Sequence, residues 1–256
     1  MTGRDKLEVI SLTEFDAVIF DMDGVITDTV RLHEAAWKRL FDEFLSTQHS
    51  GAVDVRPFSP DDYRRHVDGR ARIDGVEAFL ASRGVHLPRG TPHDTPDTTT
   101  AWGLANRKND YFVEAVASEG VEAIPSSVAF VVWARARGLR TALVTASRNR
   151  STILRASGTD TLFDVHVDGD DAATLGLAGK PAPDMFVEAA RRLGVEPARA
   201  VVVEDALAGV EAAKRGGFGL VVGLDRTGRL AAALQAHGAD LVVPDLGALI
   251  PGRAAR

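Results

Sequence analysis

Six short apolar runs constrain the fold of this chain more than any other feature. They are rich in Val, Ile and Leu and lie at 15–20, 140–145, 164–167, 200–204, 219–223 and 240–243. Strands that are covered on both faces have this pattern, whereas strands with one wet face alternate polar and apolar residues. Helical stretches separate the last five runs, as in successive βαβ units. We therefore predict an α/β fold with a doubly wound, Rossmann-like parallel sheet.

The long interval between the first two runs has a different pattern. It contains no convincing strand, and its apolar residues follow a helical period over 29–45, 61–67, 72–83, 101–118 and 126–137. Ser59 and Pro60 fit a helix start, and three of these segments are followed by a glycine that fits a C-terminal cap, at Gly84, Gly120 and Gly138. The Thr- and Pro-rich segment 89–100 predicts an exposed loop. We expect an all-helical domain at 32–118, inserted into a core of 1–31 and 119–256.

Composition and charge exclude several classes of protein. The 256 residues are 45% hydrophobic and 26% charged, as in ordinary globular proteins, and include no cysteine, which excludes disulfides, thiolate metal sites and a cysteine nucleophile. The formal charge of −6 argues against a general nucleic-acid binder. No signal peptide is evident, and no run approaches the roughly 18 apolar residues that span a bilayer. We expect a cytoplasmic protein with no nucleic-acid or membrane partner.

Two carboxylates follow the first apolar run. In open α/β sheets ligands bind at the carboxyl ends of the strands, so these positions are the first candidates for a site. Asp21 and Asp23 are two residues apart and face the same side. They fit either a capped turn or a catalytic pair, in which one carboxylate attacks an electrophile while the other moves a proton. We favour the pair, because three acids within eight residues fit a simple turn poorly.

Polar residues also follow the second run, where 145–149 reads TASRN. Hydroxyls, backbone N–H groups at a helix start and a guanidinium form a cradle for phosphate, although Thr and Ser are also ordinary helix caps. Lys180 lies between a glycine and two prolines, on a stiff loop that would hold its ammonium in place, although a lone loop lysine is usually solvated.

A second acidic pair, Glu204 and Asp205, follows the fourth run. These acids could simply complement a helix dipole. Together with Asp21 and Asp23 they supply the hard oxygen ligands that Mg²⁺ prefers, with phosphate completing the coordination. The combination of all four segments predicts magnesium-dependent chemistry on a phosphate group.

These segments resemble the haloacid dehalogenase superfamily of aspartate-nucleophile phosphotransferases. The resemblance covers nearly the whole chain and extends to the beta-phosphoglucomutase-like subgroup. It rests on DMDGVITDTVRLHEAAW (21–37), VDGRARIDG (67–75), NRKND (106–110), TASRN (145–149), GKPAPD (179–184) and VEDALAGV (203–210). The helical insertion resembles the cap of that superfamily.

The resemblance implies a role for each matched residue. Asp21 would form an aspartyl-phosphate, and Asp23 would act as general acid and base and bind the metal through its carbonyl. Glu204 and Asp205 would complete the Mg²⁺ site, and Thr145 and Lys180 would hold the transferring phosphoryl group. The remaining matched positions would bind the substrate, either at its second phosphate (Arg72, Ala146, Ser147, Arg148, Asn149) or at its sugar and the cap interface (Thr29, His33, Trp37, Gly69, Lys108, Asn109).

Simpler roles remain open for several of these residues. His33 and Trp37 are also spaced as a packing pair on one helix face, and Lys108 and Arg72 could be solvated helix charges. Thr29 could only cap a helix and Gly69 could only form a turn. The chain also departs from the subgroup, with Asp68 and Arg148 at positions where lysine is common and with the long loop at 89–100. These departures leave the identity of the sugar open.

The function implied by the resemblance is that of a monomeric enzyme acting on a small-molecule sugar phosphate. It would convert beta-glucose 1-phosphate into glucose 6-phosphate through the 1,6-bisphosphate. The alternative is a sugar-phosphate phosphatase, in which water accepts the phosphoryl group. Asp23 disfavours a dehalogenase, which has no leaving oxygen to protonate, and a non-catalytic phospho-receiver, which needs no second carboxylate. The NRKND context of Lys108 disfavours a phosphonate hydrolase.

Overall fold

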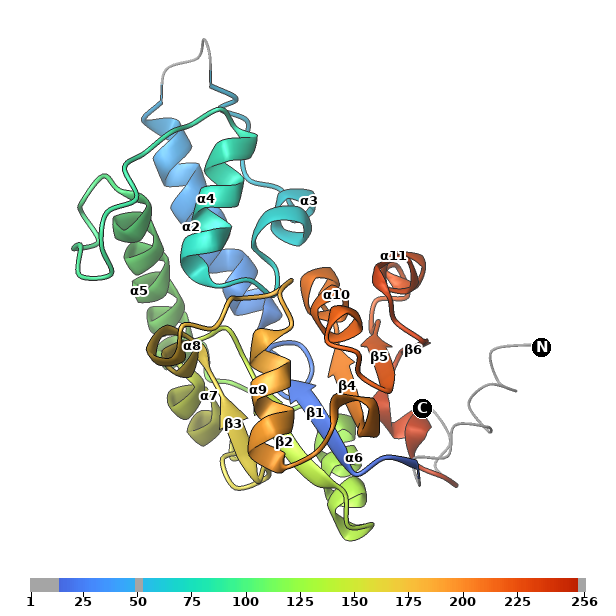
Figure 1. Ribbon diagram of the computed structural model, residues 1–256. Coiled ribbons are helices and arrows are strands. Elements are labelled where there is room, and N and C mark those ends of the chain that lie inside the picture. Colours follow the sequence, from blue (N-terminus) through green and yellow to red (C-terminus); the bar gives the residue numbers. More distant parts are fainter. Residues whose placement is uncertain (1–13, 49–52, 253–256) are drawn as a thin grey trace. The chain divides into compact units, whose positions relative to one another are not determined.

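Figure 1 shows the computed structural model of the protein, which describes residues 14–48 and 53–252. The chain divides into two compact units. The first, which we call the α/β unit, comprises the described residues up to Asp28 and from Glu122 onward. The second, which we call the helical unit, spans Thr29–Val121. The sequence predicted domain boundaries at 31/32 and 118/119. Each lies three residues inside the helical unit.

The α/β unit is built on a six-stranded parallel sheet, so the predicted fold class is confirmed. Its strand order is β3-β2-β1-β4-β5-β6. Each strand lies within two residues of its predicted bounds, at β1 Ala17–Asp21, β2 Arg140–Val144, β3 Val165–Val167, β4 Ala200–Glu204, β5 Leu220–Leu224 and β6 Leu241–Val243. At the centre of the sheet, Ile19 lies opposite Ala142 on one side and Val202 on the other.

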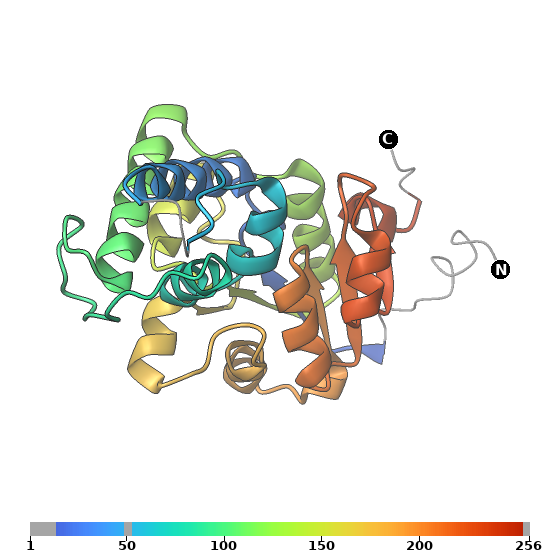
Figure 2. The ribbon, with the colours of Figure 1, turned by 90° about the horizontal axis from the view of Figure 1, so that it is seen from above.

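Helices cover both faces of this sheet (Figure 2). Ile19 belongs to the same core cluster as Met185 and Phe186, while the ring of Phe20 packs edge-on against Phe130 at 6.0 Å. Helix α9 therefore covers one face and α6 the other, and the alternating side chains of β1 are buried on both. The helices of this unit are α6 Pro125–Ala136, α7 Arg150–Ser157, α8 Gly169–Leu175, α9 Asp184–Leu193, η3 Pro197–Arg199, α10 Leu207–Arg215, α11 Ala231–His237 and η4 Leu246–Leu249.

The strand order determines where a site can form. From β1 the chain continues to β2 on one side of the sheet and reaches β4 on the other, so the topological switch point lies between β1 and β4. All six strands are parallel, and the carboxyl ends of β1 and β4 therefore lie side by side. Ligands of doubly wound sheets bind at this point.

The helical unit contains the predicted helices with small changes of bounds. Its elements are α2 Val30–Ser46, α3 Pro60–Asp62, η2 Tyr63–Val67, α4 Arg72–Ser82 and α5 Ala101–Glu119. The segment expected as one helix at 61–67 is a single α-turn, capped by Ser59 as predicted, that continues into a π-helical turn closed by the Asp68 N–H on the Tyr63 carbonyl. The core of the unit is aromatic, with Phe41 stacked on Trp37 and tilted against Phe79. Within the described ranges, no helix of either unit is both long and apolar enough to cross a membrane.

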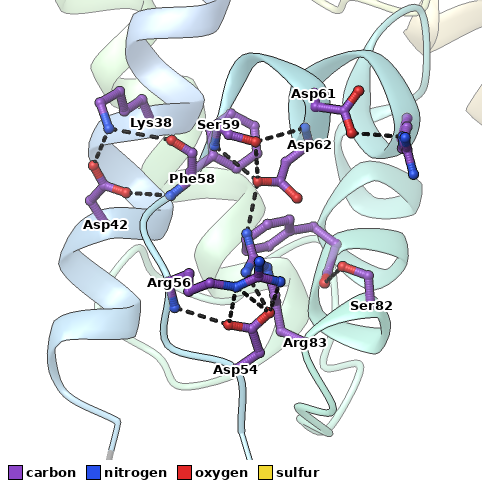
Figure 3. A network of polar contacts seen from close by, with 12 residues as sticks. Lys38, Asp42, Asp54, Arg56, Phe58, Ser59, Asp61, Asp62, Ser82 and Arg83 are labelled. Carbon is purple, nitrogen blue, oxygen red and sulfur yellow. Dashed lines mark hydrogen bonds and ion pairs between the residues drawn. The ribbon is translucent and has the colours of Figure 1, made fainter.

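A buried arginine joins two parts of the helical unit (Figure 3). Arg83, at the end of α4, is 5% exposed and donates hydrogen bonds to Asp54 at 2.8 Å and to Asp62 at 2.7 Å. Asp62 also accepts from the backbone and hydroxyl of Ser59. One guanidinium thus ties the segment before α3, and α3 itself, to the end of α4.

The loop at 89–100 has no regular structure, as predicted, but it is held in place by specific contacts. Asp94 accepts hydrogen bonds from the hydroxyls of Thr91 and Thr100 at 2.9 and 2.6 Å. The amide of Asn106 on α5 donates to the backbone carbonyls of Pro92 and Asp94. The loop is therefore fixed against the first turns of α5.

Candidate active site

Three carboxylates meet at the switch point of the sheet. Asp21 ends β1, Glu204 ends β4 and Asp205 follows it. One carboxylate oxygen from each residue lies within 4.8 Å of the other two. Asp21 is 7% exposed and Glu204 is fully buried, so their charges are largely removed from water. Such a cluster is costly without nearby positive charge.

Lys180 brings positive charge into this cluster. It lies on the loop between α8 and α9 and is 2% exposed. Its ammonium donates hydrogen bonds to Asp21 and to Glu204, the latter at 2.5 Å. Burial alone would lower the pKa of Lys180, but the charges of Asp21 and Glu204 outweigh burial and raise this pKa above its ordinary value. Lys180 therefore stays charged.

The charge around Asp21 is not balanced by Lys180 alone, which favours binding of a further cation. Burial raises the pKa of Asp21 well above its ordinary value; Lys180 opposes the shift, and Glu204 and Asp23 add to it. A carboxylate that acts as a nucleophile must be ionised, and one ammonium cannot balance four neighbouring carboxylates. The donor set of Asp21, Glu204 and Asp205 consists of hard oxygens only, which fits Mg²⁺.

Asp23 is oriented from the neighbouring strand. The hydroxyl of Thr145, which follows β2, donates a hydrogen bond to the Asp23 carboxylate at 3.2 Å. Thr145 is 1% exposed. Asp21 and Asp23 are therefore held separately, the first by Lys180 and the second by Thr145.

The segment after β2, which we call the phosphate loop (145–149), is shaped by its own hydroxyls. The Thr145 hydroxyl accepts a hydrogen bond from the N–H of Ser147, and the Ser147 hydroxyl accepts one from the N–H of Asn149, both at 3.0 Å. Helix α7 begins directly after this loop, at Arg150. Arg148 forms an ion pair with Asp170 at 3.4 Å. Hydroxyls, N–H groups and a guanidinium are thus gathered before a helix N-terminus, as an anion site requires.

Three of the predicted substrate residues meet inside the helical unit. Lys108 on α5 is 2% exposed, and its ammonium lies 2.7 Å from Nδ1 of His33 on α2. The same ammonium lies 5.0 Å from the centre of the Trp37 ring, within cation–π range. His33 also stacks on Phe112 at 4.0 Å. Lys108 is therefore not the solvated helix charge of the simpler interpretation.

The other predicted substrate residues of the helical unit lie at the starts of helices, on α5 and in a turn. Arg72 begins α4 and donates a weak hydrogen bond to the Ala105 carbonyl at 3.4 Å, and Asn109 follows Lys108 on α5. Thr29 is buried next to the start of α2, but its hydroxyl does not cap that helix. Gly69, with φ of 68°, forms the turn between η2 and α4.

Two supporting features were not predicted from the sequence. Gly209 on α10 leaves space for the Glu204 side chain, because a Cβ there would lie 1.7 Å from Oε1 of Glu204. The other oxygen of Glu204 accepts the Ala206 N–H at 2.7 Å, so this carboxylate is folded beneath the start of α10. The second feature is the contact of residues 168–170 with the phosphate loop. The only sequence signals were a glycine inside a helix and an acidic run.

Comparisons with known proteins identify the family of this chain. The family model described as haloacid dehalogenase-like hydrolase matches residues 15–217. A protein of Mycobacterium tuberculosis named beta-phosphoglucomutase is 44% identical over 239 residues, covering 91% of both chains. A trehalose-phosphate phosphatase of Mycobacterium leprae is 42% identical over 131 residues, covering 50% of this chain and 28% of that protein.

The fold also matches a solved structure. The crystal structure of a beta-phosphoglucomutase from Clostridium difficile superposes with a TM-score of 0.70 at 23% identity, covering 93% of this chain and 94% of the other. This chain is therefore an enzyme that belongs to the haloacid dehalogenase-like hydrolase family, within its beta-phosphoglucomutase-like subgroup.

Proposed function

We propose that this enzyme is a beta-phosphoglucomutase, which isomerises beta-glucose 1-phosphate to glucose 6-phosphate through the 1,6-bisphosphate. The observation that carries the proposal is the 44% identity to a protein of that name over 91% of both chains. The arrangement of Asp21, Asp23 and Lys180 supports it, because phosphoryl transfer needs a nucleophile, a proton carrier and a held positive charge.

The first step belongs to Asp21. One of its oxygens attacks the phosphorus of a sugar bisphosphate, and the bond from that phosphorus to the sugar oxygen breaks. The products are an aspartyl-phosphate and a sugar monophosphate. Lys180, which contacts Asp21, would stabilise the negative charge on the transferring group.

The proton is handled by Asp23. The leaving sugar oxygen takes a proton from Asp23 as its bond to phosphorus breaks. In the return step a different sugar hydroxyl attacks the aspartyl-phosphate, gives its proton to Asp23 and receives the phosphoryl group, which frees Asp21. The Thr145 hydrogen bond to Asp23 keeps this carboxyl oriented through both steps.

Asp21, Glu204 and Asp205 would hold Mg²⁺, together with the Asp23 carbonyl. When bound, this ion offsets charge on the phosphoryl group in transfer. The three carboxylates lie within 4.8 Å of one another, which supports such a set of ligands.

The substrate's second phosphate would be bound by residues 146–149 of the phosphate loop and by Arg72. The sugar would contact His33, Trp37, Lys108 and Asn109, and Thr29 and Gly69 would complete the substrate-binding residues. A site for two phosphates favours the mutase, because hydrolysis of one ester needs only one. The alternative is a sugar-phosphate phosphatase, which is supported by the similarity of half the chain to the trehalose-phosphate phosphatase.

Phosphorus NMR separates the two functions. The enzyme is incubated with Mg²⁺, beta-glucose 1-phosphate and a trace of glucose 1,6-bisphosphate. The proposal predicts glucose 6-phosphate that accumulates without matching inorganic phosphate. Release of inorganic phosphate and glucose in equal amounts would instead establish the phosphatase.

A further inference from the structure

The acidic run at 168–171, which we call the acidic turn, has no role in the proposed reaction. It comprises Asp168, which follows β3 and caps α8, and the first residues of α8, and it contains three aspartates, each of which pairs with an arginine. Asp168 accepts from Nε of Arg150 at 2.7 Å, and Asp170 pairs with Arg148 at 3.4 Å. Asp171 pairs with Arg192 on α9 at 2.8 Å. Two of the three acids therefore contact the phosphate loop or the residue that follows it.

The backbone of the acidic turn also touches the phosphate loop. The Gly169 N–H donates a hydrogen bond to the Ser147 carbonyl at 3.1 Å. A Cβ on Gly169 would lie 2.7 Å from the Ala146 carbonyl oxygen and 3.0 Å from Cγ of Arg148. Any larger residue would push the two segments apart, so Gly169 allows the backbone of the acidic turn to contact the phosphate loop directly.

The two ion pairs differ in burial, and this difference suggests different roles. The side chains of Asp168 and Arg150 are 10% and 25% exposed, and Asp168 also accepts the N–H groups of residues 170 and 171. This pair is fixed. The side chains of Asp170 and Arg148 are 66% and 35% exposed, and their contact is longer. Exposed pairs of this kind are weak and exchange readily with other partners.

We propose that the acidic turn sets the affinity of the enzyme for the second phosphate of its substrate. Asp168 and Gly169 hold the phosphate loop in its binding conformation. Asp170 competes with the phosphate for Arg148 and repels its negative charge, so it weakens binding and speeds release. The inference rests on the proposed function, because it takes the phosphate loop as the binding site of the second phosphate. Asp168 and Asp170 act as positioning residues, through Arg150 and Arg148.

The test measures the dissociation constant of beta-glucose 1,6-bisphosphate by calorimetry at low ionic strength, in an Asp21→Asn background that prevents transfer. Asp170→Asn is expected to tighten binding about threefold, and Asp168→Asn to weaken it about tenfold. Asp16→Asn is the matched control, because Asp16 forms an exposed pair with Arg199 elsewhere in the same unit and its loss changes the charge equally. The control is expected to bind as the background does.

A second readout separates this role from a general structural one. In enzymes that retain Asp21, both substitutions should change the KM for beta-glucose 1-phosphate, whose phosphate would occupy the second site, far more than that for p-nitrophenyl phosphate, whose only phosphate is the one transferred to Asp21. If Asp168→Asn fails to fold, as judged by its melting curve, the exposed Asp170→Asn still decides the question. Unchanged or weaker binding by Asp170→Asn would overturn this inference and leave the proposed function standing. A background protein that does not bind the bisphosphate would overturn the proposed function together with it.

Discussion

At the scale of single residues, the site depends on charges that are held out of water. Lys180 contacts both Asp21 and Glu204, although it is 159 and 24 residues away from them in the chain. A buried ammonium or carboxylate that loses its partner is strongly destabilising, whereas a fully paired set is tolerated. The geometry of the site is thus fixed by mutual neutralisation as much as by packing.

Gly209→Ala tests how Glu204 is positioned. The added methyl group would lie 1.7 Å from Oε1 of Glu204, so the carboxylate must move. We expect the half-saturating Mg²⁺ concentration to rise about tenfold, a cost of about 1.4 kcal/mol. The half-saturating Mg²⁺ concentration is measured by thermal shift during Mg²⁺ titration and by the Mg²⁺ dependence of p-nitrophenyl phosphate hydrolysis.

Glu204→Asp provides the rescue control for this change. Its side chain is one methylene shorter and leaves space for a methyl group at position 209, so Gly209→Ala should affect Mg²⁺ binding much less in the Glu204→Asp protein. Helix propensity alone predicts that Gly209→Ala stabilises the protein, because alanine is favoured over glycine in a helix by up to about 1 kcal/mol. A more stable Gly209→Ala enzyme with unchanged Mg²⁺ affinity would therefore refute the positioning role.

At the scale of elements, the buried Arg83 holds separate segments of the helical unit together. Arg83→Met would leave Asp54 and Asp62 without the guanidinium that pairs with both. We expect the free energy of unfolding to fall by about 2–4 kcal/mol, measured by urea denaturation followed by circular dichroism. Arg56→Ala is the matched control, because it removes an 82% exposed partner of the same Asp54 and should cost less than about 1 kcal/mol. Equal losses in the two variants would contradict this account.

The same network predicts a pH dependence with a definite sign. Burial would raise the pKa of Asp62, but the hydrogen bonds that it accepts from Ser59 and the charge of Arg83 outweigh burial and lower this pKa. Hydrogen bonds from Arg56 and Arg83 lower the pKa of Asp54. A depressed carboxyl pKa stabilises the fold above the ordinary value near 4 and loses that effect as the pH falls. The stability difference between wild type and Arg83→Met should therefore shrink between pH 6 and pH 3. A constant difference would show that the loss at Arg83 is one of packing alone.

The elements could be predicted where local pattern determines them. The strands were predictable because both of their faces are buried and their sequences are therefore continuously apolar. The helix ends were predictable because glycine commonly terminates helices, and Gly84, Gly120 and Gly138 do have the positive φ of such a position. The π-helical turn at 63–67 was not, since it depends on the shift of hydrogen bonding to an i+5 partner. The order of the loop at 89–100 depends on the contacts of Asp94, which composition does not reveal.

The candidate site was predictable in its residues but not in its supports. Parallel strands end at one edge of the sheet, so the acids at 21, 23, 204 and 205 were expected together. Lys180 was expected there through the family resemblance. Gly209 and Gly169 were missed, because each is needed only once another segment of the fold lies against it.

At the scale of the whole molecule, the proposed function assigns Arg72 to the second phosphate of the substrate. Arg72→Ala should lower kcat/KM for beta-glucose 1-phosphate by about 10²-fold, a loss of about 2.7 kcal/mol, because the second phosphate loses a guanidinium. Hydrolysis of p-nitrophenyl phosphate should change less than threefold. Steady-state kinetics with both substrates measures this difference, and equal losses would mean that Arg72 does not bind the second phosphate.

The central claim is that Asp21 carries the phosphoryl group, and one measurement tests it directly. The enzyme is mixed with glucose 1,6-bisphosphate labelled with ³²P and quenched within one turnover, and the labelled peptide is identified by mass spectrometry. The account predicts label on the peptide that contains Asp21, its transfer to glucose 6-phosphate on addition of unlabelled beta-glucose 1-phosphate, and neither label nor turnover in Asp21→Asn. Turnover in wild type with label on another residue, or turnover that persists in Asp21→Asn, would contradict it.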